Sequence, residues 1–250
     1  MRTSLVAALS LSIAGAAARA DVITIGAAQD NTLYEDFQGS RSNGSGRYMF
    51  AGSTAGWAYR RALVAFDIAD SIPPGSTILS ASLTLHMSRS ISGNEAVSLH
   101  RVLADWGEGA SRAPGEEGEG APSQPGDATW IHTFYDSQFW AAPGGDFEGA
   151  HSASILVGPS VGFYTWSSNV ALIADVQGWL DDPGQSFGWI VIGNESTYTT
   201  AKRFDTRENG NANYRPMLTI EYVPIPAPGG CLLLMAGAIG LGARRRAGRR

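Results

Sequence analysis

Residues 79–87 read LSASLTLHM, and this stretch decides the fold. Its side chains alternate strictly, with apolar residues on one face of an extended chain: Leu79, Ala81, Leu83, Leu85 and Met87. The other face carries two serines, a threonine and a histidine. A period of two over nine residues predicts a β-strand that lies between a core and solvent, as in an antiparallel sheet.

Further strands are predicted on both sides of it. Residues 62–68 (ALVAFDI) alternate as well, and residues 96–103 follow after a turn at 90–94. Residues 188–195 (GWIVIGNE) are apolar enough for a strand covered on both faces, and residues 217–223 (MLTIEYV) close the series.

One segment has a helical period instead. Val170, Ile173, Val176 and Leu180 recur behind Asn169, which suits a helix N-cap, and the run stops before a Pro-Gly pair. We therefore expect an all-β fold, a jelly-roll-type antiparallel β-sandwich with one short helix crossing one end.

The two ends of the chain differ from this body. Residues 1–20 have a positive start, an apolar run and an Ala-Arg-Ala cleavage site ending at Ala20, as a secretory signal peptide does. Residues 224–250 form a tail in which 229–243 carry no charge and arginines follow. As a helix this run spans about 22 Å, less than the roughly 30 Å of a bilayer's hydrocarbon core. It suits a transient membrane stop that is then processed, and a permanent anchor is the alternative.

The tail resembles PEP-CTERM sorting tails of Gram-negative bacteria. The resemblance rests on Pro224 and Pro226 in VPIPA, the apolar run, and the arginine cluster, although Ile225 stands where the usual motif has Glu. It implies transient anchoring in the inner membrane, cleavage by an exosortase-type processing enzyme, and delivery to the cell surface or extracellular matrix. Such tails accompany exopolysaccharide production.

Charge and cysteine content narrow the function of residues 21–223. Seven of the 18 Lys and Arg residues lie in the two ends, which leaves 11 against 23 acids, a net charge of −12. Nucleic-acid binding needs a basic surface, so no nucleic-acid partner is expected. The one cysteine, Cys231, lies in the tail, so the body has no disulfide.

Short motifs in the body also occur together, in this order, in one known family. They are QDNTLY (29–34), RRALVAFD (60–67), IPPGSTI (72–78), DWGEG (105–109), ATW (128–130), VQGW (176–179), GWIVI (188–192) and RPML (215–218). Over residues 27–222 the chain resembles DNRLRE-domain proteins, which are related to alginate-binding carbohydrate-binding modules of family 96. The resemblance implies a non-catalytic β-jelly-roll that binds polysaccharide.

Aromatic and arginine side chains are the candidate ligand-binding residues. A flat ring offers an apolar platform to a sugar, and a guanidinium pairs with a uronate carboxylate. The candidates are Trp57, Tyr59, Arg60, Trp140, Tyr164, Trp166, Arg203 and Arg207. Packing within the protein is the alternative role for each of them.

Acidic residues in Gly-flanked loops are the candidate metal ligands. Asp105, Glu108 and Asp146 form one possible calcium site, and Asp30 with Asn31, Glu35 and Asp36 forms another. Solubility of the loops and turn formation are the alternatives. His86 and His100 lie on the polar faces of consecutive strands, which would make half a metal site, but solvated histidines suit the pattern better.

No catalytic residue is predicted. Residues 184–188 (GQSFG) match a nucleophile elbow, but the helical segment precedes the serine and the strand follows it, which is the reverse of the required order. We expect an exported, non-enzymatic protein that binds polysaccharide. The alternatives are a structural or adhesive matrix protein without a glycan ligand and a polysaccharide-degrading enzyme.

Overall fold

In the computed structural model, which describes residues 19–225, the alternating stretch is the middle of one long strand, β6 (Thr77–Ser90). Leu83, Leu85 and Met87 are fully buried, and Ala81 is buried with them. Leu79 is 44% exposed because the register between β6 and β15 shifts there: Ser80 pairs with Glu221 and Ile78 with Tyr222, which leaves Leu79 unpaired and turns Ile78 into the core instead. From Ala81 to Met87, the apolar face predicted from the alternation is therefore the buried face of the strand.

Strand β6 organises the first half of a curled sheet, in which all pairs are antiparallel. It pairs with three other strands, and two more strands lie outside these. The members besides β6 are β1 (Asp21–Gly26), β15 (Met217–Val223), β12 (Gly162–Trp166), β14 (Lys202–Asp205) and β4 (Tyr48–Ser53). We call this set the first half-sheet.

The second half-sheet continues from β4 through its hairpin with β5, so that the described strands of both halves form one eleven-stranded sheet. Its members are β5 (Tyr59–Ala65), β2 (Gln29–Tyr34), β13 (Trp189–Ile192), β7 (Glu95–Arg101) and β11 (Ala153–Val157). The chain passes between the halves near Gly52, where φ is +119° and a Cβ would come within 2.9 Å of the Cα of Ala201. Only glycine fits there.

The curl brings the inner faces of the two halves together around one core. Leu85 and Phe204 of the first half-sheet share this core with Val64 and Leu99 of the second. A second apolar cluster lies on the opposite face of β2, β5 and β13, where the segment after β7 covers the sheet with Trp106, Trp130 and Trp140. The second half-sheet is thus covered on both faces.

The helix and the short elements close the ends of the structure. The helix α2 (Val170–Asp181) is capped by Asn169, whose side chain accepts hydrogen bonds from the amides of Ala171 and Leu172. The remaining elements are α1 (Ile68–Ser71), the 3-10 turns η1 (Pro183–Gln185) and η2 (Ala212–Tyr214), and the short pairs β9 (His132–Phe134) with β10 (Gln138–Phe139) and β3 (Arg41–Ser42) with β8 (Ala121–Pro122). Among residues 19–225, no helix is long and apolar enough to cross a membrane.

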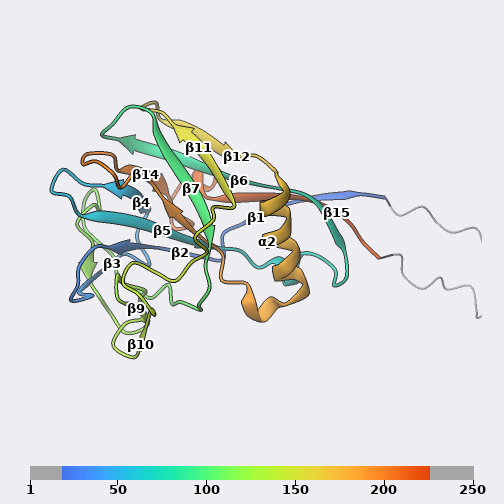
Figure 1. Cartoon of the computed structure of the whole chain (residues 1–250), viewed down its shortest axis with the longest axis horizontal. Helices are drawn as coiled ribbons and strands as arrows, with labels where there is room; N and C mark the ends of the chain where they lie inside the picture. Colours follow the sequence, from blue (N-terminus) through green and yellow to red (C-terminus); the bar gives the residue numbers. More distant parts are fainter. Residues whose placement is uncertain (1–18, 226–250) are drawn as a thin grey trace, which may run out of the picture.

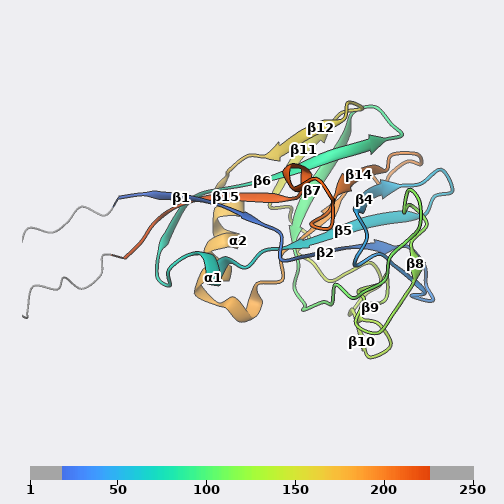
Figure 2. The same cartoon turned by 180° about the vertical axis from the view of Figure 1, so that it is seen from behind.

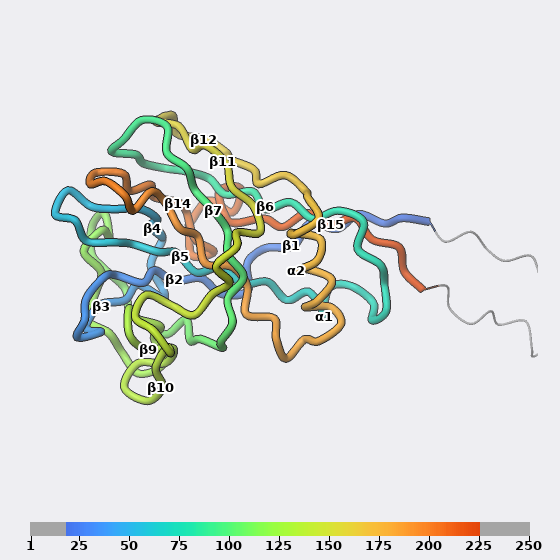
Figure 3. Tube along the Cα trace, viewed as in Figure 1, coloured from blue at the N-terminus to red at the C-terminus, as the bar shows by residue number. Residues whose placement is uncertain are grey.

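Both ends of the described chain leave from the same end of the molecule. Asp21 of β1 pairs with Tyr222 of β15, and this two-stranded ribbon projects beside α2 (Figures 1 and 3). The turn between β4 and β5 lies at the opposite end (Figure 1). Figure 2 shows the loop that carries β8 beside that same opposite end.

The predicted all-β antiparallel chain with one short helix is confirmed, and the curled sheet is consistent with a sandwich. The strand predicted at 217–223 is confirmed, whereas those at 96–103 and 188–195 are shorter than predicted. The strand predicted at 62–68 ends at Ala65, and Ile68 begins α1 instead. Ala20 and Pro224 lie in extended chain just outside β1 and β15. The apolar run of the signal peptide, Pro226, Cys231 and the tail helix lie outside the described residues.

A buried cation joins two turns at one edge of the core. Lys202, the only lysine of the chain, is fully buried, and its Nζ donates to Ser90 Oγ (2.8 Å), Gly93 O (2.6 Å) and Gly158 O (3.0 Å). Burial lowers the pKa of the Lys202 ammonium. These hydrogen bonds fix the β6–β7 turn against the β11–β12 turn.

We expect Lys202→Met to lower the free energy of unfolding by about 1–3 kcal/mol, because it removes the charge-assisted hydrogen bonds that join the two turns. Urea denaturation of the full-length chain measures the loss. Ser154→Ala, at an exposed position on β11, is the control and should change stability by less than about 0.5 kcal/mol. Equal stability of the two variants would contradict the structural role of the ammonium group.

Candidate functional site

The outer face of the first half-sheet carries the groups suited to binding. Phe204 of β14 and Met49 of β4 point into the core, so alternation places Arg203, Asp205, Tyr48 and Phe50 on the opposite face. Two adjoining hollows lie on this face.

The first hollow, which we call the arginine groove, has a volume of about 200 Å³. It lies between β4, β5, β6 and β14 on one side and part of the loop 107–128 on the other. Its lining residues are Phe50, Thr54, Arg60, Arg89, Ile91, Glu116, Gly118, Glu119, Ala201 and Arg203. Three guanidinium groups face two carboxylates here, so the groove has a net positive charge in a chain that is negative as a whole.

Glu116 bridges two of these arginines. Its Oε2 accepts hydrogen bonds from Arg89 Nη1 (2.7 Å) and from Arg203 Nη1. The Arg89 bond first, and then the Arg203 bond, hold the pKa of this exposed carboxyl below its usual range, so Glu116 is ionised near neutral pH. A ligand carboxylate would have to displace it.

Arg60 and Arg203 are held in place by aromatic rings. The Arg203 guanidinium lies 3.7 Å from the centre of the Tyr48 ring, and its Nε donates to Ser88 Oγ at 3.1 Å. The Arg60 guanidinium lies 4.8 Å from the centre of the Tyr34 ring, and burial lowers its pKa. Such stacking orients a guanidinium. Arg60 is only 6% exposed, and its Nε and Nη1 donate to Gly118 O (3.3 Å) and Tyr59 O (2.9 Å), so its edge is used within the protein.

The second hollow, the histidine hollow, has a volume of about 400 Å³. It is lined by Tyr48, His86, Ser88, Val161, Asp205, Asn209, Asn211 and Tyr214. His86 Nδ1 lies 2.5 Å from Asp205 Oδ2, and Asp205 Oδ1 accepts a hydrogen bond from Asn209 Nδ2 at 2.9 Å. The Tyr214 ring stacks on the His86 ring with centroids 4.0 Å apart and planes 6° from parallel.

The two hollows meet at Arg203 and Tyr48, and exposed rings flank them. Beside the histidine hollow, Phe163 is 52% exposed and Tyr214 is 38% exposed. At the β4–β5 turn, next to Thr54 of the arginine groove, Trp57 and Tyr198 are each 55% exposed with centroids 5.2 Å apart. Together they make one band of aromatic, basic and amide groups across the half-sheet.

The structure brings Trp57, Arg60 and Arg203 of the predicted ligand residues to this band. It does not bring the other aromatic candidates there. Trp166 and Trp140 are only 0% and 5% exposed, so neither ring is available to a ligand.

Tyr164 and Tyr59 point away from the band. Tyr164 packs against the core and donates its hydroxyl to Ser160 O at 2.8 Å. Tyr59 packs with the second apolar cluster, 6.5 Å from the Trp130 ring centre.

Arg207 is engaged within the protein rather than presented to a ligand. Its Nε donates to Glu108 Oε1 at 2.6 Å and lies 3.0 Å from Glu208 Oε1, and its backbone amide donates to Asp30 Oδ2 at 2.8 Å. The side-chain hydrogen bonds that Arg207 donates to Glu108 are the main reason that the pKa of Arg207 is raised.

Asp30, Glu108 and Glu208 form an acidic cluster around this arginine. Burial, followed by the charge of Glu208, raises the pKa of Asp30 well above its ordinary value. Burial is also the main cause of the raised pKa of Glu208. These are the described side chains that converge as metal ligands do.

Neither predicted grouping of calcium ligands is found among residues 19–225. Asp30 and Glu108, assigned to different sites from the sequence, lie together. Asp105 and Asp146 are used locally: Asp105 Oδ1 accepts the amide of Trp106, and the Asp146 carboxylate accepts the amides of Ala141 and Ala142.

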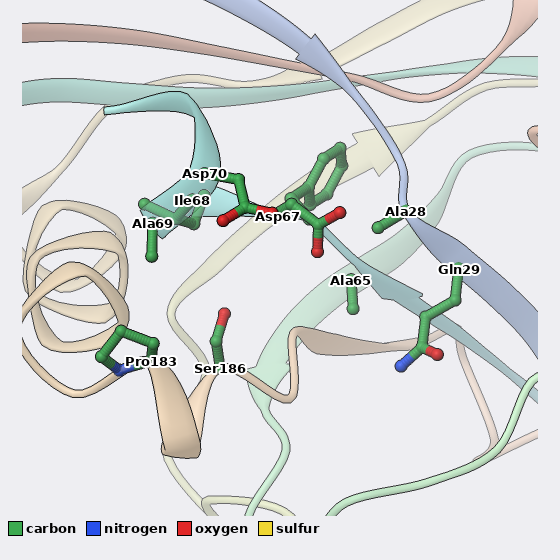
Figure 4. Close-up of a pocket in the computed structure, with 10 residues that line it drawn as sticks. Ala28, Gln29, Ala65, Asp67, Ile68, Ala69, Asp70, Pro183 and Ser186 are labelled. Atoms are coloured by element: carbon green, nitrogen blue, oxygen red, sulfur yellow. The ribbon is translucent and has the colours of Figure 1, made fainter. Parts of the chain in front are cut away.

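The pattern GQSFG at 184–188 does not form a nucleophile elbow. Ser186 lines a cavity of about 430 Å³ together with Asp67 and Asp70, and no histidine lines it (Figure 4). His86 and His100 do not form half a metal site either, because β6 and β7 belong to opposite half-sheets and do not pair. His100 instead contacts Glu148 O through Nδ1 at 2.9 Å.

Sequence reasoning missed most of the histidine hollow. Phe163 was recoverable, because alternation in GFYTW (162–166) pairs Tyr164 with Trp166 on one face and Phe163 with Thr165 on the other. Tyr214, Asn209 and Asn211 lie in an irregular connection, for which no periodic signal exists. No protein-family model matches the chain, and no curated protein matches it.

We expect Trp166→Ala to lower the free energy of unfolding by about 3–5 kcal/mol, because it empties a fully buried site in the core. Trp57→Ala should cost less than about 1 kcal/mol, since that ring is half exposed. Urea denaturation followed by far-ultraviolet circular dichroism compares the two. A large loss in Trp57→Ala would show that this ring serves the fold rather than a ligand.

Proposed function

We propose that the chain is an exported, non-catalytic protein of the cell surface or extracellular matrix that binds an anionic polysaccharide along the band. The observation that carries the proposal is the meeting of Arg89 and Arg203 with half-exposed aromatic rings beside one sheet face, where the buried Arg60 adds a third positive charge. The proposal includes a jelly-roll fold of DNRLRE type, a signal peptide before residue 21 and a PEP-CTERM-like tail.

The chemistry of the band suits a sugar acid. The exposed faces of Trp57, Phe163 and Tyr214 offer apolar platforms to the C–H faces of pyranose rings. Asn209 and Asn211 supply amide donors and acceptors for hydroxyl groups. The arginines supply planar donors that match a carboxylate, and without them a neutral glucan would serve equally well.

The position of the chain ends supports presentation of the band away from an anchored tail. The ribbon of β1 and β15 projects at one end, and the β4–β5 turn with Trp57 lies at the other (Figure 1). A tail that continues from Val223 would leave the Trp57 end free to meet a matrix polymer.

A polysaccharide-degrading enzyme is the second candidate, and the histidine hollow is the observation that favours it. The His86–Asp205 pair resembles an oriented general base, and Tyr48 and Tyr214 add hydroxyl groups to the same hollow. A lyase would use such a base to take the proton next to the uronate carboxylate. A carbon–carbon double bond then forms as the bond to the leaving sugar oxygen breaks, and a tyrosine hydroxyl of the hollow would give that oxygen a proton. Shortening of the polymer by the wild-type chain, abolished in His86→Gln, would establish this activity and overturn the non-catalytic proposal.

We expect Arg203→Ala and Glu116→Gln to change binding in opposite directions. Arg203→Ala should weaken binding to alginate or pectate at least about tenfold, because a charge-assisted hydrogen bond is lost. Glu116→Gln should strengthen it, by up to about fivefold, because the competing carboxylate is neutralised. Affinity electrophoresis of the full-length chain in polymer-containing gels gives both dissociation constants.

Arg41→Ala, at an exposed position on β3 outside the band, is the matched control and should bind like the wild type. Equal retardation of the wild type and Arg203→Ala would exclude the arginine groove as the binding site. Absence of retardation in every acidic and neutral glycan would favour a structural or adhesive matrix protein.

A further inference from the structure

Three carboxylates from distant parts of the chain converge beside the β14–β15 connection. Asp30 belongs to β2, Glu108 lies in the loop after β7, and Glu208 lies three residues after β14. One oxygen from each lies within 4.8 Å of the others. Like charges repel at this separation, so a cluster of this kind requires compensation.

Two oxygens of the cluster have no partner within the protein. Asp30 is 0% exposed, and while its Oδ2 accepts the Arg207 amide, its Oδ1 accepts no hydrogen bond. Glu208 Oε2 is likewise buried without a partner. A fully buried carboxylate oxygen without a donor is costly, and in native proteins such an oxygen is normally hydrogen-bonded or bound to a cation.

The protein supplies only part of the missing positive charge. Arg207 contacts Glu108 through Nε and Nη2, and its Nε also contacts Glu208. With all three carboxylates ionised, as cation binding requires, one guanidinium leaves the cluster with a net charge of −2. Arg207 donates to both carboxylate oxygens of Glu108, so the oxygens without a partner are on Asp30 and Glu208.

We propose that Asp30, Glu108 and Glu208 bind one calcium ion. An all-oxygen ligand set selects a hard cation, and the net charge of the cluster matches a divalent one. Oxygens at 2.3–2.6 Å on opposite sides of a calcium ion lie about 5 Å apart, and neighbouring ones lie closer, which agrees with the spacing of the cluster. Magnesium is disfavoured because it requires shorter, strictly octahedral contacts.

The ion would fix the connection that supplies the histidine hollow. Asp205 and Asn209 lie on either side of Arg207 and Glu208, and the amide of Asn209 donates to Thr206 O at 3.1 Å. A calcium ion shared with Asp30 would tie this connection to β2. The proposal does not depend on the glycan ligand, because the cluster lies outside the lining of both hollows.

Calcium titration of the full-length chain tests the proposal. Isothermal titration calorimetry after EDTA treatment should give one calcium ion per chain. Thermal unfolding should shift upward by about 5–10 °C at a calcium concentration one hundred times the dissociation constant. Asp30→Asn and Glu208→Gln should lose the binding heat and the shift. In EDTA, Asp30→Asn should melt above the wild type, because the unpartnered oxygen no longer carries charge.

Asp105→Asn is the matched control, since Asp105 lies three residues before Glu108 in the same connection and its carboxylate accepts only a local amide. It should keep the wild-type response to calcium. The absence of binding heat and of any shift in millimolar calcium would overturn the proposal. A response to magnesium but not to calcium would overturn the assignment of the ion.

Discussion

The alternation of side chains along β6 is the constraint on which the rest of the first half-sheet depends. Three strands pair with β6 along its length. Residues paired across a sheet point to the same face, so the inward and outward residues of β6 determine those of each partner strand. His86 lies opposite Phe163 of β12, and Arg89 lies opposite Arg203 of β14. A register slip by one residue would exchange the core with the outer face. The same strand pairing therefore determines both the core on the inner face and the candidate binding band on the outer face.

One irregularity in that pairing enlarges the band. Strict alternation from His86 would place Ser88 and Ser90 outside and Arg89 inside. The register between β6 and β14 shifts between Arg203 and Phe204, so that Met87 pairs with Phe204 and Arg89 with Arg203. Ser88 then lines the histidine hollow while Arg89 lines the arginine groove. A β-bulge of this kind re-aims a side chain without ending the strand, and here it adds a guanidinium to the site.

Local patterns predicted five of the eleven strands of the sheet, the helix and the Asn169 cap, because each depends on residues near one another in sequence. The same patterns failed where distant segments meet. Asp30 was grouped with Glu35 and Asp36, and Glu108 with Asp105 and Asp146, whereas sheet topology brings Asp30 to Glu108 and Glu208. Trp166 and Tyr164 were chosen as binding rings because aromatic residues suit sugars. The two residues are two positions apart in β12, so they lie on the same side of the strand, and the pairing of β12 with β6 makes that the core side. The side chains that a core needs and those that a sugar needs are the same types, so composition does not separate them.

The burial of Lys202 has a practical consequence for chemistry on this protein. Because the chain has one lysine and its ammonium lies inside the β6–β7 and β11–β12 turns, reagents that acylate amines reach only the α-amino group of the folded chain. For a chain that begins near residue 21, that group lies at the β1 end, far from Trp57 (Figure 1). Amine coupling to a sensor surface or a fluorophore would thus attach the protein at a single point and in a single orientation, with the band facing the solution.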